Sequence, residues 1–213
     1  MRFIFKLLAA TVVTAALSSC SALTGYPTDA EATYAKAIEL TKKNVDTDKF
    51  KVYSVSFLEG EQLSDDLMLV TVKLVNKDNR AFSQSYYMNG LAPTDLRDVQ
   101  QTFEAPEYAT TVGIDLDKLD PKLIAEQIAQ AKTMLPEGHS FKSVGRYEIE
   151  ETVPAGNSAF NRGKTFGEQH TTFIVRFTED GKETESSAGK TSYIYYEGKV
   201  TVGADGTLSI EEN

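Results

Sequence analysis

A helical pattern followed by several strand patterns occurs twice along this chain, and this order limits the fold more than any other feature of the sequence. Residues 29–44 and residues 120–135 each place apolar side chains at the spacing that one buried side of a helix requires. Runs of alternating apolar and polar residues follow both helices and predict half-buried strands. Helices that cover one face of an antiparallel sheet define the α+β class, which we therefore expect here.

The expected strands can be placed from this alternation and from turn signals such as Asn76-Lys77-Asp78-Asn79. They cover residues 53–57, 68–74, 82–88, 141–153, 170–178, 183–196, 199–202 and 207–210. The spacing of apolar residues also predicts a short helix over 94–103. Asp120 is expected to cap the second long helix, and Thr28 or Asp29 the first.

The chain therefore divides into two helix-plus-antiparallel-meander repeats, residues 29–115 and 116–213, which form either two separate units or one continuous curved sheet. Asp48-Lys49-Phe50-Lys51 and His139-Ser140-Phe141-Lys142 occupy matching places after the two helices. In outline this order resembles the small tandem helix-on-sheet modules of secreted bacterial proteins, such as PepSY-like domains and β-lactamase inhibitory proteins. A single curved sheet of the cystatin or NTF2 kind is the alternative.

The first 19 residues have the three parts of a secretory signal. Arg2 and Lys6 provide the positive start, residues 7–16 form an apolar run of ten, and two serines then lead up to Cys20. A membrane-spanning helix needs about 20 apolar residues, so this run is too short to be a permanent anchor. We therefore expect residues 1–19 to be removed from the mature protein.

Leu17-Ser18-Ser19-Cys20 resembles the lipobox of bacterial lipoproteins, and Cys20 is the single cysteine of the chain. The resemblance implies cleavage before Cys20, diacylglycerol on its thiol and acylation of its amino group. Residues 20–28 would then be a lipidated tether, because two or more acyl chains anchor a protein stably to a membrane. Ser21 stands where retention in the inner membrane would require Asp, so the expected location is the periplasmic face of an outer membrane. An ordinary secretory signal is the alternative.

The charge of the chain excludes one class of partner. Without residues 1–19, the remaining 20 basic and 31 acidic side chains give a net charge of −11. Such a surface repels the phosphates of nucleic acids. Nucleic-acid binding is therefore not expected.

Two groups of residues are candidates for binding. The segment 154–167, longer than an ordinary hairpin connection, carries a cationic and aromatic set typical of interface hot spots. The members of this set are Phe160, Arg162, Lys164 and Phe166. Tyr86 and Tyr195 belong to strand-borne tyrosine groups in which one neighbour points to the core and the other can line a ligand face. Packing in the core and a long loop without a binding role are the alternatives.

Catalytic and metal-binding patterns are weak. The two histidines, His139 and His170, have no recognisable serine nucleophile motif and no neighbouring metal ligands in the sequence. Glu148 and Glu150 alternate with apolar residues, as on the solvated face of a half-buried strand. Asp115, Asp117 and Asp120 are interpreted as capping and solvated surface residues, with a weak cation site as the alternative.

The sequence thus favours a non-enzymatic, lipid-anchored periplasmic binding or assembly module with no cofactor and with an envelope protein as partner. A lipoprotein that binds a glycan or small ligand on a tyrosine-lined sheet face is the alternative.

Overall fold

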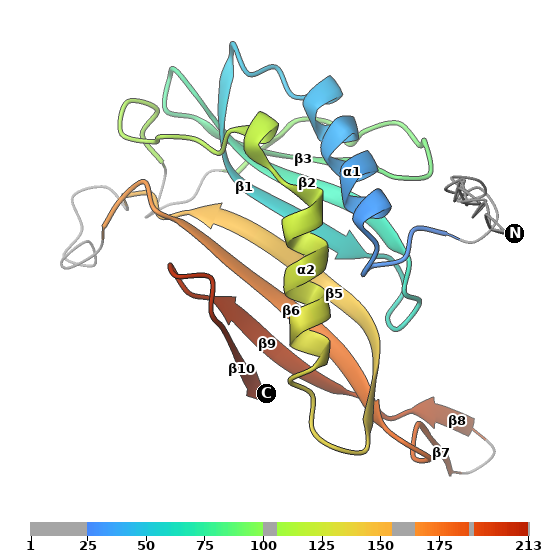
Figure 1. Ribbon diagram of the computed structural model, residues 1–213. Coiled ribbons are helices and arrows are strands. Elements are labelled where there is room, and N and C mark those ends of the chain that lie inside the picture. The colour runs from blue at the N-terminus through green and yellow to red at the C-terminus, as the bar shows by residue number, and fades with distance from the viewer. Residues whose placement is uncertain (1–24, 100–105, 155–164, 188–189, 213) are drawn as a thin grey trace, which may run out of the picture.

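The computed structural model describes residues 25–99, 106–154, 165–187 and 190–212 of the 213-residue chain (Figure 1). The elements of the first half are α1 (Glu31–Asn44), β1 (Phe50–Glu59), β2 (Leu67–Asn76), β3 (Ala81–Tyr87) and β4 (Arg97–Asp98). The second half contains η1 (Leu116–Lys118), α2 (Pro121–Lys132), β5 (His139–Glu151), β6 (Gln169–Glu179), β7 (Thr184–Ser187), β8 (Lys190–Tyr193), β9 (Tyr196–Val202) and β10 (Leu208–Glu212).

Eight strands of the described chain form one antiparallel sheet in the order β10-β9-β6-β5-β1-β2-β3-β4, and β7 and β8 form a separate hairpin. The first strands of the two halves, β1 and β5, pair at the centre of this sheet, with Phe57 opposite Tyr147. Both halves therefore share one continuous sheet. The expected α+β class with antiparallel strands is confirmed.

Both helices lie on the same face of the sheet (Figure 1).

The N-termini of α1 and α2 are capped differently. Asp120 caps α2 as expected, because its carboxylate accepts a hydrogen bond from the backbone N–H of Lys122 at 2.9 Å. The expected cap of α1 is wrong: Ala30 is the N-cap and makes no side-chain hydrogen bond, while Thr28 binds the sheet instead.

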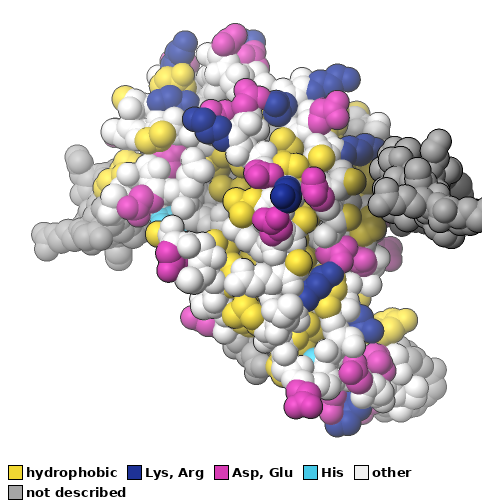
Figure 2. All heavy atoms as spheres, viewed as in Figure 1, with side chains coloured by type: hydrophobic (Ala, Val, Ile, Leu, Met, Phe, Trp, Pro, Cys, Tyr) yellow, Lys and Arg dark blue, Asp and Glu magenta, His cyan; other side chains and the backbone are white. Residues whose placement is uncertain are grey.

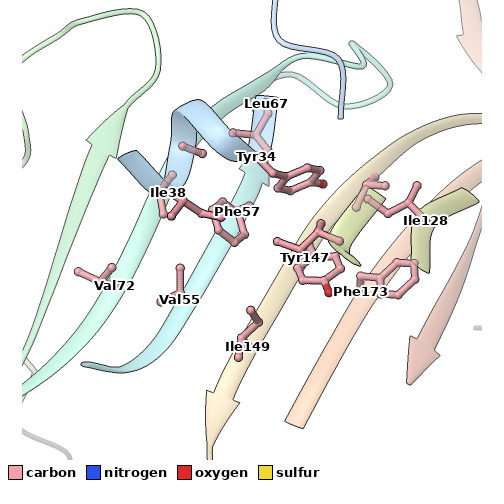
Figure 3. Close-up of a cluster of buried hydrophobic side chains, with 14 of the residues drawn as sticks. Tyr34, Ile38, Val55, Phe57, Leu67, Val72, Ile128, Tyr147, Ile149 and Phe173 are labelled. Atoms are coloured by element: carbon pink, nitrogen blue, oxygen red, sulfur yellow. The ribbon is translucent and has the colours of Figure 1, made fainter. Parts of the chain in front are cut away.

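One hydrophobic core lies between the helices and the sheet (Figure 3). At its centre the ring of Tyr34 from α1 packs edge-on against Phe57 of β1, with ring centroids 5.3 Å apart. Tyr147 of β5 stacks on Phe173 of β6 at 5.2 Å. Ile128 of α2 is fully buried in the same core. Side chains from both halves thus fill a single interior.

Two expected elements differ from the structure. Residues 94–99 are not helical where they are described, because Val99 donates its N–H to Ala81 O and Arg97–Asp98 pairs with β3 as an edge strand. The expected strand over 183–196 is instead the β7–β8 hairpin followed by the start of β9.

Candidate functional site

The face of the sheet opposite the helices carries a regular pattern of polar side chains, and none of the described helices covers it. Side chains of paired residues in neighbouring strands share a face, and successive residues alternate between faces. Phe57, Tyr147 and Phe173 point to the helices, so the residues beside them in sequence point away. On the helix side, by contrast, charges of both signs are interspersed with apolar groups (Figure 2).

Three parallel rows of side chains, which we together call the polar face, cross the sheet on this opposite side. The first row is mixed apolar and charged and consists of Tyr87, Leu69, Leu58, Arg146, Ile174, Lys199 and Glu211. The second row contains six hydroxyls and one carboxylate, from Ser85, Thr71, Ser56, Glu148, Thr172, Thr201 and Ser209. The third row alternates charged and polar groups, from Arg97, Ser83, Lys73, Ser54, Glu150 and His170.

Internal hydrogen bonds satisfy the part of the hydroxyl row that lies on β3, β2, β1 and β5. Ser56 donates its hydroxyl to Glu148 Oε1 at 2.8 Å, and the hydroxyls of Thr71 and Ser85 lie 2.8 Å apart. In the third row, Lys73 Nζ donates to Glu150 Oε1, also at 2.8 Å. These contacts confirm that Glu148 and Glu150 lie on the solvated side of their strand.

The row differs on β6, β9 and β10. The described residues offer no hydrogen-bond partner to the hydroxyls of Thr172, Thr201 and Ser209. Beside them lies a pocket of about 260 Å³ that is lined by Arg146, Glu148, Thr172, Phe173, Ile174 and Lys199. Arg146 and Lys199 flank Ile174 on the neighbouring strands. The pocket therefore offers a hydroxyl, an apolar floor and two cations, of which Arg146 already has its Nη1 3.6 Å from Oε2 of Glu148. Such a set suits a carboxylate next to an apolar group.

A buried ion-pair cluster bounds the polar face at the end where β1 finishes. Arg176 binds Glu59, whose side chain is 1% exposed, and its Nε donates to Glu197 Oε1 at 2.8 Å. Burial opposes the charge of Arg176, but the hydrogen bond to Glu197 and the charge of Glu59 prevail, so the pKa of Arg176 is raised above its ordinary value. Gly145 is needed below this cluster, since a Cβ there would lie 2.7 Å from Arg176 Cζ.

The two tyrosines expected on a ligand face do not lie together. Tyr86 is only 1% exposed, lies in the core and donates its hydroxyl to Gln84 Oε1 at 2.9 Å. Burial raises the pKa of Tyr86 to about 12. The neighbour Tyr87 is the one that points to the polar face. Tyr195 is half-buried between β8 and β9, where Gln62 Nε2 donates to its hydroxyl.

Of the expected partner-binding loop, Phe160, Arg162 and Lys164 lie outside the described residues, as does Cys20. Phe166 is described and is 37% exposed. The base of the loop is closed by two backbone hydrogen bonds, from Thr152 N to Glu168 O at 2.9 Å and from Gly167 N to Thr152 O at 3.0 Å.

The two histidines lie at opposite ends of the β5–β6 pair. His139 packs edge-on against Phe177 and Tyr196 with both centroid distances at 5.5 Å. His170 lies opposite Glu150 at the end of the third row. In the described part of the chain, no hydroxyl is hydrogen-bonded to a histidine, and no group of three His, Cys, Asp or Glu is placed to hold a metal ion. Asp115 and Asp120 act as caps, as interpreted from the sequence.

Comparison with known proteins found no matching protein family, no matching curated protein and no matching solved structure. Across the described residues, no helix is both long and apolar enough to cross a membrane.

Proposed function

We propose that this protein is a non-catalytic, lipid-anchored binding module of the bacterial cell envelope, which carries its lipid on Cys20 and binds an envelope protein through the polar face. The N-terminal signal supports the anchor. The observation that carries the binding role is the alignment of three side-chain rows, two across seven paired strands and one across six, opposite both helices.

The size of the polar face fits a modest protein interface. Six spacings of about 4.8 Å make the hydroxyl row about 29 Å long, and three rows span on the order of 500 Å² of sheet, at the centre of which Ser54 and Ser56 are buried. A standard interface buries about 800 Å² on each partner, so this face suits a small or transient contact. Its first row mixes Tyr87, Leu58, Ile174 and Arg146, and such mixtures of apolar, tyrosine and arginine side chains are typical of protein interfaces.

A photo-crosslinking residue placed at Thr201 in intact cells tests this role. We expect a discrete crosslinked protein from Thr201, which is exposed on the polar face, and none from the control position Ala129, which is exposed on α2. Charge reversal of the pocket by Arg146→Glu with Lys199→Glu should reduce the yield about tenfold, the equivalent of ~1.4 kcal/mol. Equal adducts from Thr201 and Ala129 would contradict the proposal.

The anchor is tested separately. Cys20→Ser should leave the protein unprocessed or release it from membranes, because the thiol is the proposed acceptor of the lipid. Mature Cys20→Ser protein that remains bound to membranes as strongly as wild type would exclude the lipid anchor and leave the binding role of the polar face untouched.

A glycan is the second candidate for the polar face. The hydroxyls of Thr172, Thr201 and Ser209 have no partner in the described part of the chain and lie beside the carboxylate of Glu148. They favour a glycan, since hydroxyl and carboxylate groups are natural hydrogen-bond partners of sugars. The test is binding to envelope polysaccharide. Loss of this binding in the double variant Thr172→Val with Thr201→Val would favour the glycan over the protein, provided that the variant Arg146→Glu with Lys199→Glu still binds.

We also propose that the two halves are an internal repeat. Both halves begin with a helix on the same side of the sheet and continue with an antiparallel meander, and their first strands pair with each other. The C-terminal half alone, residues 116–213, should then pair β5 with β5 of a second copy. Sedimentation should show a folded dimer, and a folded monomer would contradict the repeat.

A further inference from the structure

The chain enters the fold at a fixed point. Tyr26 donates its N–H to Asp66 Oδ1 at 2.6 Å, and its carbonyl accepts from Leu67 N at 2.8 Å. Two residues later, Thr28 donates its N–H to Asp65 Oδ1 at 3.0 Å and accepts from Val144 N at 2.8 Å through its hydroxyl. Residues 26–28 are thus attached to β2, to β5 and to the loop between β1 and β2.

This attachment limits how far the fold can stand from a lipid on Cys20. Five residue steps separate Cys20 from Gly25, and an extended chain spans at most about 18 Å over them. A ten-residue strand such as β1 is itself about 33 Å long. The opposite end of the sheet, about 33 Å away along β1, therefore cannot lie next to the membrane.

An exposed leucine lies beside the same point. Gly25 and Tyr26 share a pocket of about 370 Å³ with Met88 and Asn89, at the start of the loop that follows β3. In Figure 1 the chain enters the fold on the side where this loop projects. Leu91, two residues further on, is 61% exposed.

The surroundings of Leu91 also suit a lipid surface. Residues 88–94 contain no charged side chain. The two ends of this segment are fixed to the sheet, because Met88 N donates to Met68 O at 2.8 Å and Thr94 N donates to Ser85 O at 2.9 Å. The uncharged tip that carries Leu91 is therefore held outward at a defined place.

We propose that the end of the sheet formed by residues 25–28 and 88–94 faces the membrane and that Leu91 enters the headgroup region of the bilayer. This inference rests on the proposed lipid anchor at Cys20. Leucine is favourable in that region because its apolar surface leaves water. The Leu67 end of β2 and the Tyr87 end of β3 then point toward the bilayer.

Site-specific labels test this orientation in the full, lipidated protein. Because Cys20 is the only cysteine and its thiol carries the lipid, Leu91→Cys introduces a single free thiol for a fluorescent label. Val112→Cys is the matched control, since Val112 is similarly exposed at 68%. The N–H of Val112 binds the carboxylate of Glu151 at the far end of β5. Thr28 binds β5 at Val144, so the control position lies about 23 Å further along the strand than the point where the chain enters the fold.

The labelled proteins are reconstituted in vesicles of phosphatidylethanolamine and phosphatidylglycerol that contain a lipid-attached quencher. We expect at least threefold stronger quenching at position 91 than at position 112, and the reverse order with iodide in the water. Equal quenching of the two labels in protein that floats with the vesicles would overturn the orientation alone. Protein that fails to float would overturn the lipid anchor and the orientation together.

Discussion

Glu59 and Arg176 are 117 positions apart in the sequence and form an ion pair in which the carboxylate is 1% exposed and the guanidinium side chain 16% exposed. Glu59 ends β1 in the first half of the chain, and Arg176 belongs to β6 in the second. The pair therefore links both halves on the side of the sheet that the helices leave free.

Removal of the cation from this pair should destabilise the fold. Arg176→Met leaves the carboxylate of Glu59 buried, and among the described residues only the N–H of Asp65 remains as its partner, at 2.8 Å. We therefore expect a loss of about 3 kcal/mol in the free energy of unfolding. Lys182→Met is the control, because it breaks an exposed pair with Glu179 and should give no measurable change in urea unfolding. Equal stability of both variants would show that the buried pair contributes little.

Asp65→Asn should stabilise the protein at neutral pH. Burial raises the pKa of Asp65, and the charges of Asp29 and Glu59 raise it further. The hydrogen bonds from Thr28 lower it, but the raising effects prevail. The folded state thus holds the proton of Asp65 more tightly than the unfolded state, and ionisation of this group costs stability at pH 7. Asparagine keeps an acceptor for Thr28 and tolerates the positive φ of 52°.

Because Asp65 is half-exposed, solvent screening limits the expected gain to about 0.5 kcal/mol. The gain should be largest at neutral pH and disappear as the pH falls through the raised pKa, where the wild-type carboxyl is itself neutral. Urea unfolding of both proteins at several pH values measures this difference. A variant that is less stable than wild type at pH 7 would mean that the carboxylate charge is favourable here.

Ile128→Asp should abolish folding of the whole chain rather than of the second half. The side chain is fully buried in the core shared by both halves, and an unpaired charge there costs at least about 4 kcal/mol. Ala129→Asp, on the exposed side of the same helix, serves as the control and should unfold near the wild-type temperature. Calorimetry would contradict this expectation if an N-terminal transition survived in Ile128→Asp.

Alkaline pH should weaken the fold through buried tyrosines. Burial raises the pKa of Tyr53 and of Tyr86 to about 12, and it also raises the pKa of Tyr34 and Tyr147 from the ordinary 10.0. Between pH 10 and 12 the unfolded chain loses protons that the folded chain retains, so stability falls as the pH rises. In a pH titration followed by tyrosinate absorbance, these four tyrosines should ionise at higher pH than the other tyrosines in the native protein. In urea, all tyrosines should ionise together.

Local patterns in the sequence predict much of this fold. The periodicity of residues 29–44 and 120–135 matches α1 and α2, and alternation around Glu148 and Glu150 assigns these carboxylates to the solvated side. Alternation alone does not say which set of residues faces inward. Tyr86 and Tyr87 are chemically alike, and only the pairing with Val70 and Leu69 decides that Tyr86 is the buried one.

Long-range pairing accounts for the residues that the sequence did not reveal. Arg146, Thr172 and Lys199 are ordinary polar residues in their own strands and become neighbours only through the register of β5, β6 and β9. The segment 94–99 has helical spacing, but its hydrogen bond to Ala81 is available only at the free edge of β3. In residues 183–196, the alternation predicted one strand and hid the separate pairing of Ser187 with Lys190.

The central pairing of β1 with β5 also sets the order in which the molecule can fold. Ser54 and Glu148 lie 94 positions apart, so ribosomal synthesis completes β1 long before its partner exists. During that interval β1 has an unsatisfied backbone edge and an apolar side, the combination that promotes pairing with other chains. Closing so long a loop is slow, and refolding should take milliseconds to seconds. The strand at the middle of the finished sheet is therefore the one most exposed to aggregation while the chain is being made.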